Sequence, residues 1–254
     1  MKDQACTPSA LAIPLIIMAA CSGGERPQTI STEVDLKMES ALIGSWMPDR
    51  FCACVEAKRS VFACRTVPHA FFRVDVVRDS GRGDSLVMTG VTEHEGGPDW
   101  AIGYDAQTLD LRTATGHAAI RPQGNAMMEM RSDGTSGWER YRLVDGPNAL
   151  ERILFQHEYT DELGNDVTFQ PKGVLTGLSG KDRHEVLFDF TEGHESEDIV
   201  FIHAEGDTAV WDHHAYHFRF QSDTLLLYSM EFLEPHVFKV GPLWKRLLPN
   251  TADR

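Results

Sequence analysis

Alternation of apolar and polar residues constrains the fold of this 254-residue chain more than any other feature. Beyond Leu42, apolar residues recur at every second position in short runs, and turn residues separate the runs roughly every 8–12 positions. The clearest runs are 71–77, 186–190, 199–203, 216–220 and 225–228. A period of two sends successive side chains to opposite faces of a β-strand. The pattern therefore predicts an all-β protein, either an antiparallel barrel or a sandwich.

A faint internal repeat suggests that the β-rich region consists of two tandem units. Four residues recur at the same spacing further along the chain: Leu42, Gly44, Asp49 and Arg50 match Leu175, Gly177, Asp182 and Arg183. A repeated unit would mean two barrels, whereas an accidental match would leave a single large domain. We predict a first β unit at 40–146, a connector hairpin at 147–171, a second β unit at 172–248 and a tail at 249–254.

The first unit begins with a segment that resembles the opening strand of lipocalin-like (calycin) domains. The segment Leu42-Ile-Gly44-Ser-Trp46 contains the Gly-x-Trp motif of that family. The resemblance implies a barrel in which the tryptophan closes one end and a basic residue near the last strand packs on its ring. The residues to which it assigns these barrel-closing roles are Trp46 and Arg140 in the first unit and Trp244 in the second, with Arg142, Lys245 and Arg246 as alternative basic partners.

An apolar run at 10–20 followed by Cys21 predicts that the chain is exported. The run is too short for a membrane-spanning helix, which needs about 20 residues, and Pro14 would interrupt a helix. Its length suits the apolar core of a signal peptide. The two alanines before Cys21 resemble the lipobox of bacterial lipoproteins, in which a peptidase cuts before the cysteine that then carries the lipids, palmitate among them. The resemblance implies a signal peptide at 1–20 and a flexible tether at 21–39.

The residue after the cysteine bears on localisation. In the lipoprotein family, Ser22 rather than an aspartate implies passage to the outer membrane, with the protein facing the periplasm. The membrane would then be a partner through the lipid on Cys21, because two or more acyl chains give stable anchoring. Ordinary signal cleavage is the alternative, and it would give a secreted or soluble periplasmic protein.

The charge balance restricts the possible partners. The chain has 38 acidic and 24 basic side chains, a formal net charge of −14 at pH 7. Binding to nucleic acid depends largely on Lys and Arg contacts with phosphates, so nucleic acid is not expected as a partner. Electrostatic docking on anionic lipid is disfavoured for the same reason.

Three cysteines remain in the mature chain beyond Cys21. We interpret 51–64 as a β-hairpin with a three-residue loop, which places Cys54 directly opposite Cys64. Opposed Cα atoms lie about 4.5–5.5 Å apart, within the range for a disulfide. Cys52 would then compete for Cys64 or stay free. The alternative is a metal site made of the three cysteines and His69.

The sequence carries no recognisable enzyme motif, so we assign no catalytic residue, metal ligand or cofactor. Our first hypothesis is a non-enzymatic envelope protein that binds a small apolar or amphipathic ligand or a protein partner. The alternatives are an envelope hydrolase with dispersed carboxylate or histidine chemistry, and a purely structural lipoprotein that assists assembly. Large side chains such as Phe218 and Leu227 should fill the second unit, so we expect the ligand in the first unit or between the two.

We predict that Cys21 is the acylated N-terminus of the mature protein. Mass spectrometry of the N-terminal peptide should find a mass increment of the attached acyl chains on Cys21. An intact Met1, or an unmodified peptide beginning at Gly23, would contradict the prediction.

Overall fold

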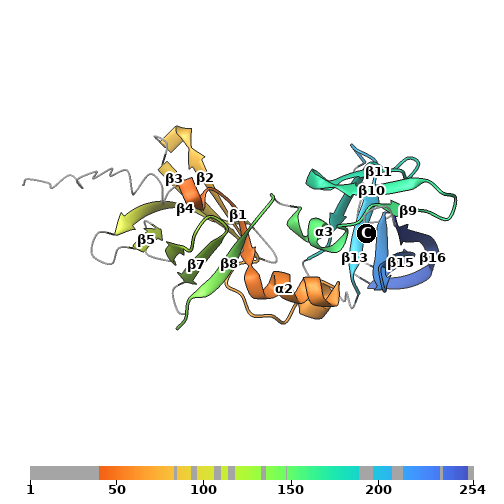
Figure 1. Cartoon of the computed structure of the whole chain (residues 1–254), viewed down its shortest axis with the longest axis horizontal. Helices are drawn as coiled ribbons and strands as arrows, with labels where there is room; N and C mark the ends of the chain where they lie inside the picture. The colour runs from red at the N-terminus through yellow and green to blue at the C-terminus, as the bar shows by residue number, and fades with distance from the viewer. Residues whose placement is uncertain are drawn as a thin grey trace, which may run out of the picture.

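The computed structural model describes residues 40–250, with gaps at 83–84, 93–95, 106–109, 114–117, 133–135, 147, 189–196, 208–213 and 235–236. The described residues form two antiparallel β-barrels (Figure 1). The prediction of an all-β fold is confirmed, and the prediction of two tandem β units agrees with the two rings of strands. The signal peptide, Cys21 and the tether lie outside the described residues.

The first barrel contains eight strands in chain order, and the last strand pairs with the first to close the ring. The strands are β1 (Gly44–Pro48), β2 (Arg73–Asp79), β3 (Ser85–Val91), β4 (Gly96–Asp105), β5 (Asp110–Thr113), β6 (Ala118–Pro122), β7 (Met127–Ser132) and β8 (Glu139–Val144), with a 3-10 turn η2 (Ser80–Arg82) between β2 and β3. Buried residues on alternate positions, among them Val74, Val76 and Met88, fill its interior. The period of two in the sequence is therefore the alternation of inward and outward side chains.

The second barrel repeats this up-and-down order with another eight strands. They are β9 (Tyr159–Thr160), β10 (Asp166–Gln170), β11 (Val174–Thr176), β12 (Arg183–Val186), β13 (Ile199–His203), β14 (Ala215–Gln221), β15 (Thr224–Glu234) and β16 (Val237–Pro249), with a 3-10 turn η3 (Pro171–Gly173) between β10 and β11. The two residues of β9 pair with both β10 and β16, so a very short strand closes this ring.

The predicted boundary between the units is wrong on the side of the second barrel. The segment predicted as a connector hairpin at 147–171 begins with a short helix, α3 (Ala149–Leu154), and its hairpin, formed by β9 and β10, belongs to the second barrel. The last strand also reaches Pro249, the first residue of the predicted tail. Residues 161–165 form the turn between the paired strands β9 and β10, so this polar segment lies within the second barrel.

The hairpin predicted across 51–64 is also wrong. This segment begins as a helix, α2 (Asp49–Lys58), and continues into a 3-10 turn, η1 (Phe62–Cys64). Phe51, Cys52 and Val55 are buried along one side of the helix, a helical spacing that a short apolar run does not distinguish from a strand. The helix ends at Lys58, and the C-cap residue Arg59 adopts a left-handed backbone conformation with φ of 51°.

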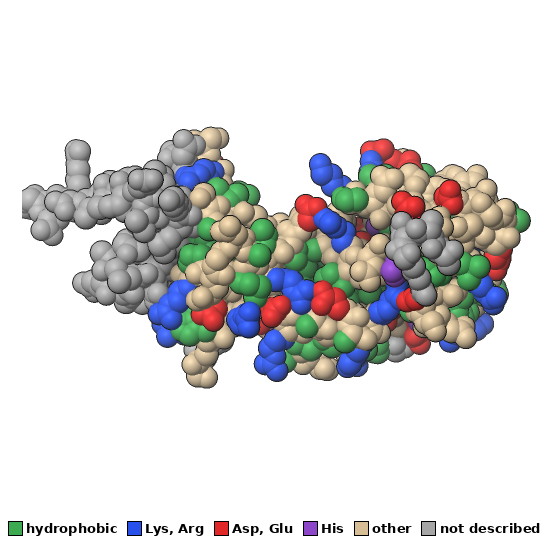
Figure 2. All heavy atoms as spheres, in the orientation of Figure 1, with side chains coloured by type: hydrophobic (Ala, Val, Ile, Leu, Met, Phe, Trp, Pro, Cys, Tyr) green, Lys and Arg blue, Asp and Glu red, His purple; other side chains and the backbone are tan. Residues whose placement is uncertain are grey.

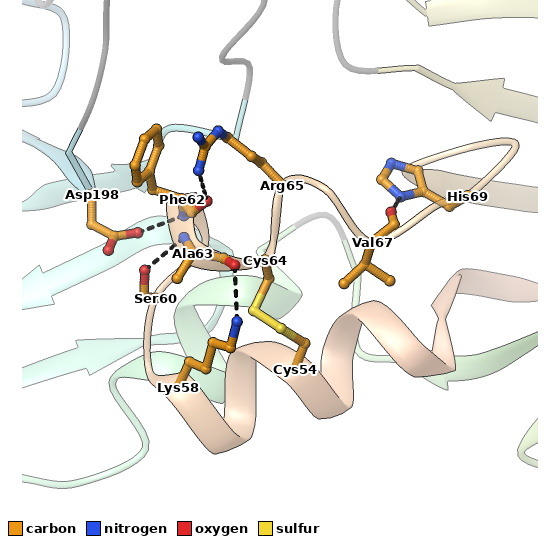
Figure 3. The surroundings of a disulfide bond; sticks show 10 residues. All are labelled: Cys54, Lys58, Ser60, Phe62, Ala63, Cys64, Arg65, Val67, His69 and Asp198. Carbon is orange, nitrogen blue, oxygen red and sulfur yellow. Dashed lines mark hydrogen bonds between the residues drawn. A yellow bond between two sulfur atoms is a disulfide. The ribbon is translucent and has the colours of Figure 1, made fainter.

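The disulfide between Cys54 and Cys64 is confirmed, although it joins a helix to a turn rather than two strands (Figure 3). The Cα atoms of the two residues lie 5.9 Å apart. The Lys58 ammonium also donates to the Ala63 carbonyl oxygen, at 3.2 Å, and closes the same loop. Cys52 is buried and has a free thiol. Two sulfur atoms in a disulfide are not available as thiolates, so the cysteine metal site considered above is not formed.

The segment between β1 and β2 packs against the second barrel and joins the two units. Its buried residues share one continuous hydrophobic cluster with the interior of that barrel. The Arg59 guanidinium lies 3.6 Å from the centroid of the Phe220 ring and forms an ion pair with Asp223. Phe72 stacks on Phe188, with ring centroids 4.2 Å apart. One end of the second barrel is thereby covered by residues that precede it in the chain.

The sequence repeat does not correspond to equivalent positions in the two barrels. Leu42 and Gly44 lie at the start of the first barrel, where Gly44 opens β1. Leu175 lies in β11, the third strand of the second barrel, and Gly177 in the turn after it. The barrels share strand number and connectivity, but these four residues do not relate them.

Replacing both Cys54 and Cys64 with alanine should lower the free energy of unfolding by roughly 2–3 kcal/mol, because the unfolded chain loses a short closed loop. Urea unfolding measures the change. Cys52→Ala is the matched control: peptide mapping under non-reducing conditions should still find the Cys54–Cys64 bond. A Cys52–Cys64 bond in the wild-type protein would contradict the structure.

Candidate binding site at the mouth of the second barrel

The second barrel is hollowed at the end away from α2. In an up-and-down barrel, successive turns alternate between the two ends. The segment carrying α2 contacts the β12–β13 and β14–β15 connections, through Asp198 and Asp223. The hollow, of about 590 Å³, lies at the β9–β10 and β11–β12 turns of the opposite end. Its lining residues, which we call the mouth site, are Asp161, Leu163, Asn165, Gly177, Leu178, Ser179, Trp244 and Lys245.

A bulge in β16 brings two side chains to the mouth site. Lys245 pairs with Leu227 and Leu243 pairs with Tyr228, so Trp244 is an extra residue in the ladder. A bulge redirects side chains locally, and here both Trp244 and Lys245 line the hollow. The Trp244 ring stacks on Tyr216 of β14, with centroids 4.2 Å apart and an interplanar angle of 27°. Because the indole stacks on Tyr216, it is partly buried and is held in place by that ring.

An ion pair forms the polar part of the mouth site. The Lys245 ammonium lies 3.3 Å from Oδ2 of Asp161, whose side chain is only 2% exposed. The backbone N–H groups of Leu163 and Asn165 both donate to Oδ1 of Asp161, at 2.9 Å. The Asn165 backbone and side-chain hydrogen bonds are the main reason that the pKa of Asp161 falls to about 2. The carboxylate is therefore ionised at any physiological pH.

The turn opposite this ion pair depends on a glycine. Gly177 has a φ of +90°, and a Cβ placed on it would come within 1.8 Å of the Asp166 carbonyl oxygen. Only a residue without a side chain allows the β11–β12 turn to approach β10 so closely. This approach places Leu178 and Ser179 at the rim of the hollow.

Trp46 and Trp244 lie in different environments, and Arg140 does not have its predicted role. Trp46 is fully buried in the first barrel, where its indole N–H donates to the Leu42 carbonyl oxygen at 2.7 Å. Arg140 is exposed and neighbours the buried Tyr141, so it lies on the outer face of β8. The prediction that Arg140 packs on Trp46 is wrong, because inward and outward positions alternate along a strand.

The alternative basic partner, Arg142, also points away from Trp46. Its guanidinium forms ion pairs with Asp49, at 3.0 Å, and with Glu56, both on α2. Arg142 therefore attaches the first barrel to the helix that contacts the second.

Basic and acidic side chains are interspersed over both barrels and the region of α2 on the face shown in Figure 2.

Two further hollows, of about 470 Å³ each, lie outside the barrel mouth. One is bordered by the loop at 65–70 and by Phe72, and the other lies between α2, β8 and α3. The second is lined by Arg142 and Glu56, which already bind each other. The mouth site differs from both because it combines an aromatic ring, a buried carboxylate and an ammonium in one place.

The described cysteine and histidine side chains offer little for metal chemistry. Burial raises the pKa of the Cys52 thiol to about 12, so it stays protonated. His214 contacts Asp207 and Lys181, whereas His217 contacts the Asp198 carbonyl oxygen. Across the part of the chain that the structure describes, no three His, Cys, Asp or Glu side chains gather as a metal site.

One histidine that the sequence did not single out lies within the second barrel. His184 is 2% exposed on the inner face of β12, and its ring centroid is 5.0 Å from that of Phe169. Neither ring nitrogen makes a hydrogen bond of normal geometry with a described residue. Burial lowers the pKa of His184 to about 4, against a smaller opposing effect of the Gly173 backbone. The imidazole is therefore neutral at pH 7.

The sequence identified Trp244 and, as one alternative basic partner of it, Lys245, but it did not identify Asp161 or Asn165 as residues of the mouth site. Asp161 stands four residues before Asn165 in a turn that includes Gly164, and an aspartate in such a position often binds backbone N–H groups of its own turn. That signal indicates the turn. The pairing of Asp161 with Lys245, 84 residues away, is visible only in the fold.

No protein-family model, curated protein or solved structure matches this chain. None of the helices in the described ranges is long and apolar enough to cross a membrane.

The buried His184 should make the protein less stable in mild acid. Its pKa is lowered from 6.5 in the unfolded chain to about 4 in the fold. As the pH falls from 6.5 to 4, the unfolded chain binds a proton that the folded protein does not. The free energy of unfolding should therefore fall by up to about 3 kcal/mol over this range.

Urea unfolding at several pH values measures this loss. His184→Gln should remove most of it, and His69→Gln, in the loop before the first barrel's second strand, should retain it. An unchanged pH dependence in His184→Gln would show that another group is responsible.

Proposed function

We propose that this protein is an exported, lipid-anchored envelope protein without enzymatic activity, which binds a small apolar or amphipathic molecule at the mouth site. The observation that carries the proposal is the 590 Å³ hollow in which Trp244 lies beside the Asp161–Lys245 pair. Ligand pockets typically combine apolar and aromatic walls with a few placed polar groups, and barrel mouths are among their usual positions.

The architecture supports a lipocalin-like interpretation of the two barrels. Eight strands in up-and-down order are the arrangement of lipocalin barrels, and both rings have it. The interior of the second ring is filled by side chains such as Phe218 and Leu227, which are fully buried. A ligand of this barrel would therefore sit at the mouth rather than deep inside, which differs from our expectation of a site in the first unit or between the two.

The hydrogen bonding of Asp161 favours binding over hydrolysis at this site. A general acid or base works best with a pKa near the operating pH. Asp161 has a pKa of about 2, and its two oxygens already accept bonds from Leu163, Asn165 and Lys245. The carboxylate thus organises the turn and pairs with the ammonium.

The location rests on the sequence of the N-terminal region. A signal peptide at 1–20, lipid on Cys21 and a tether at 21–39 would attach the two barrels to the outer membrane on its periplasmic side. A small apolar molecule released from a membrane would then meet the mouth site close to its source. A partner protein in the envelope is the remaining alternative for the same surface.

Titration with N-phenyl-1-naphthylamine, a neutral apolar dye that fluoresces when bound, tests the site. Trp244→Ala should weaken binding about tenfold, since the dye loses an aromatic wall. Trp244→Phe should restore most of the affinity because a ring remains. Trp138→Ala is the matched control, since Trp138 packs under Arg121, 3.9 Å from its ring centroid, in the first barrel.

Equal dye binding by the wild-type protein and Trp244→Ala, with both folded by circular dichroism, would contradict the mouth site. Dye binding lost in Trp138→Ala instead would move the site to the first barrel. No dye binding by the wild-type protein would favour the structural, assembly-accessory alternative.

A further inference from the structure

The charges within the mouth site cancel. Asp161 contributes one negative charge and Lys245 one positive charge, with 3.3 Å between the carboxylate oxygen and the ammonium nitrogen. An anionic headgroup would approach Lys245 only beside this carboxylate, and the chain as a whole carries a net charge of −14. A cationic headgroup would meet the ammonium itself. Within hydrogen-bond range of the pair, neither sign of ligand charge gains a net attraction.

The polar groups at the mouth site nevertheless offer both donors and acceptors. An ammonium has three donors, and the Lys245 group directs one of them to Asp161. The Asn165 side-chain nitrogen also donates to Asp161, at 3.1 Å from Oδ2, so the acceptor end of this exposed amide is directed elsewhere. Ser179 adds an exposed hydroxyl at the rim. A hydroxyl group donates and accepts alike, which suits such a mixed set.

Apolar surface adjoins these polar groups. Trp244 is partly buried, Leu178 at the rim is buried, and Leu163 is 81% exposed in the β9–β10 turn. Covering apolar side chains with an alkyl chain is worth roughly 25 cal/mol per Å² of apolar area removed from water. A bound molecule gains this free energy only if its apolar part continues directly from the headgroup that contacts Lys245.

We infer that the mouth site takes a neutral amphiphile with a hydroxyl-rich headgroup, such as a sugar, joined to an alkyl chain. The headgroup lies at Lys245, Asn165 and Ser179, and the chain lies along Trp244 and Leu163. This inference rests on the proposed function and specifies the class of ligand that the same site accepts.

Competition against bound N-phenyl-1-naphthylamine distinguishes the headgroups, with every amphiphile kept below its micelle concentration. Octyl β-D-glucoside and octanoate carry chains of similar length, but one headgroup is neutral and hydroxylated and the other is anionic. Octyl glucoside should displace the dye at about one-tenth of the concentration that octanoate requires, a difference of about 1.4 kcal/mol.

Two substitutions at the ion pair test the position of the headgroup. Asp161→Asn retains an oxygen acceptor for the turn but removes the negative charge. The affinity for octanoate should therefore rise about tenfold relative to the affinity for octyl glucoside. Lys245→Met should weaken octyl glucoside about tenfold while dye binding stays within about twofold, because the dye does not use the ammonium. Trp138→Ala should change neither the affinity for octanoate relative to octyl glucoside nor the affinity for octyl glucoside relative to the dye.

The outcomes separate this inference from the proposed function. Octanoate that matches or exceeds octyl glucoside in wild-type protein would overturn the neutral headgroup, as would octyl glucoside that fails to displace the dye. In both cases dye binding that depends on Trp244 would leave the proposed function standing. Dye binding that does not depend on Trp244 would remove both. If Asp161→Asn unfolds, the Lys245→Met result decides the position of the headgroup.

Discussion

The packing of the β1–β2 segment on the second barrel is the interaction on which the arrangement of this protein depends. Arg59 lies against the Phe220 ring and also donates to the Ser222 and Leu154 carbonyl oxygens, so one guanidinium contacts a strand, a turn and α3. A partly buried cation–π contact of this kind contributes about 0.5–2 kcal/mol. The disulfide holds the segment that presents Arg59. Buried residues of this segment consequently share one hydrophobic cluster with the interior of the second barrel, whereas the interior of the first barrel forms a cluster of its own.

This packing also determines which end of the second barrel stays open. Residues of α2, η1 and α3 cover the end at the β12–β13 and β14–β15 connections, and Phe155 at the end of α3 stacks on Phe169 with ring centroids 4.4 Å apart. The opposite end has a hollow, and the bulge at Trp244 in β16 lies beside it. A filled interior, one sealed end and one open mouth leave a shallow site with an aromatic wall, in which specificity depends on the headgroup.

Local patterns predicted part of this structure and misjudged the rest for identifiable reasons. The alternation at 216–220 and 225–228 gave strands that pair as β14 and β15. The spacing of Cys54 and Cys64 gave the correct disulfide through the wrong element, since both a hairpin and a helix followed by a turn bring these residues together. Arg140 was misassigned because the Gly-x-Trp resemblance names a basic residue but not the face on which it lies.

The sequence by itself determined the β-strand content and the cysteine pair, because these depend on periodicity and on residues close together in the chain. Only the tertiary structure decided the ring closure, the docking of α2 and the mouth site. The Asp161–Lys245 pair joins residues 84 positions apart, and Trp244 reaches its place through a bulge defined by pairing with β15. Such contacts follow from strand register, which is set by packing across the whole barrel rather than by any local pattern.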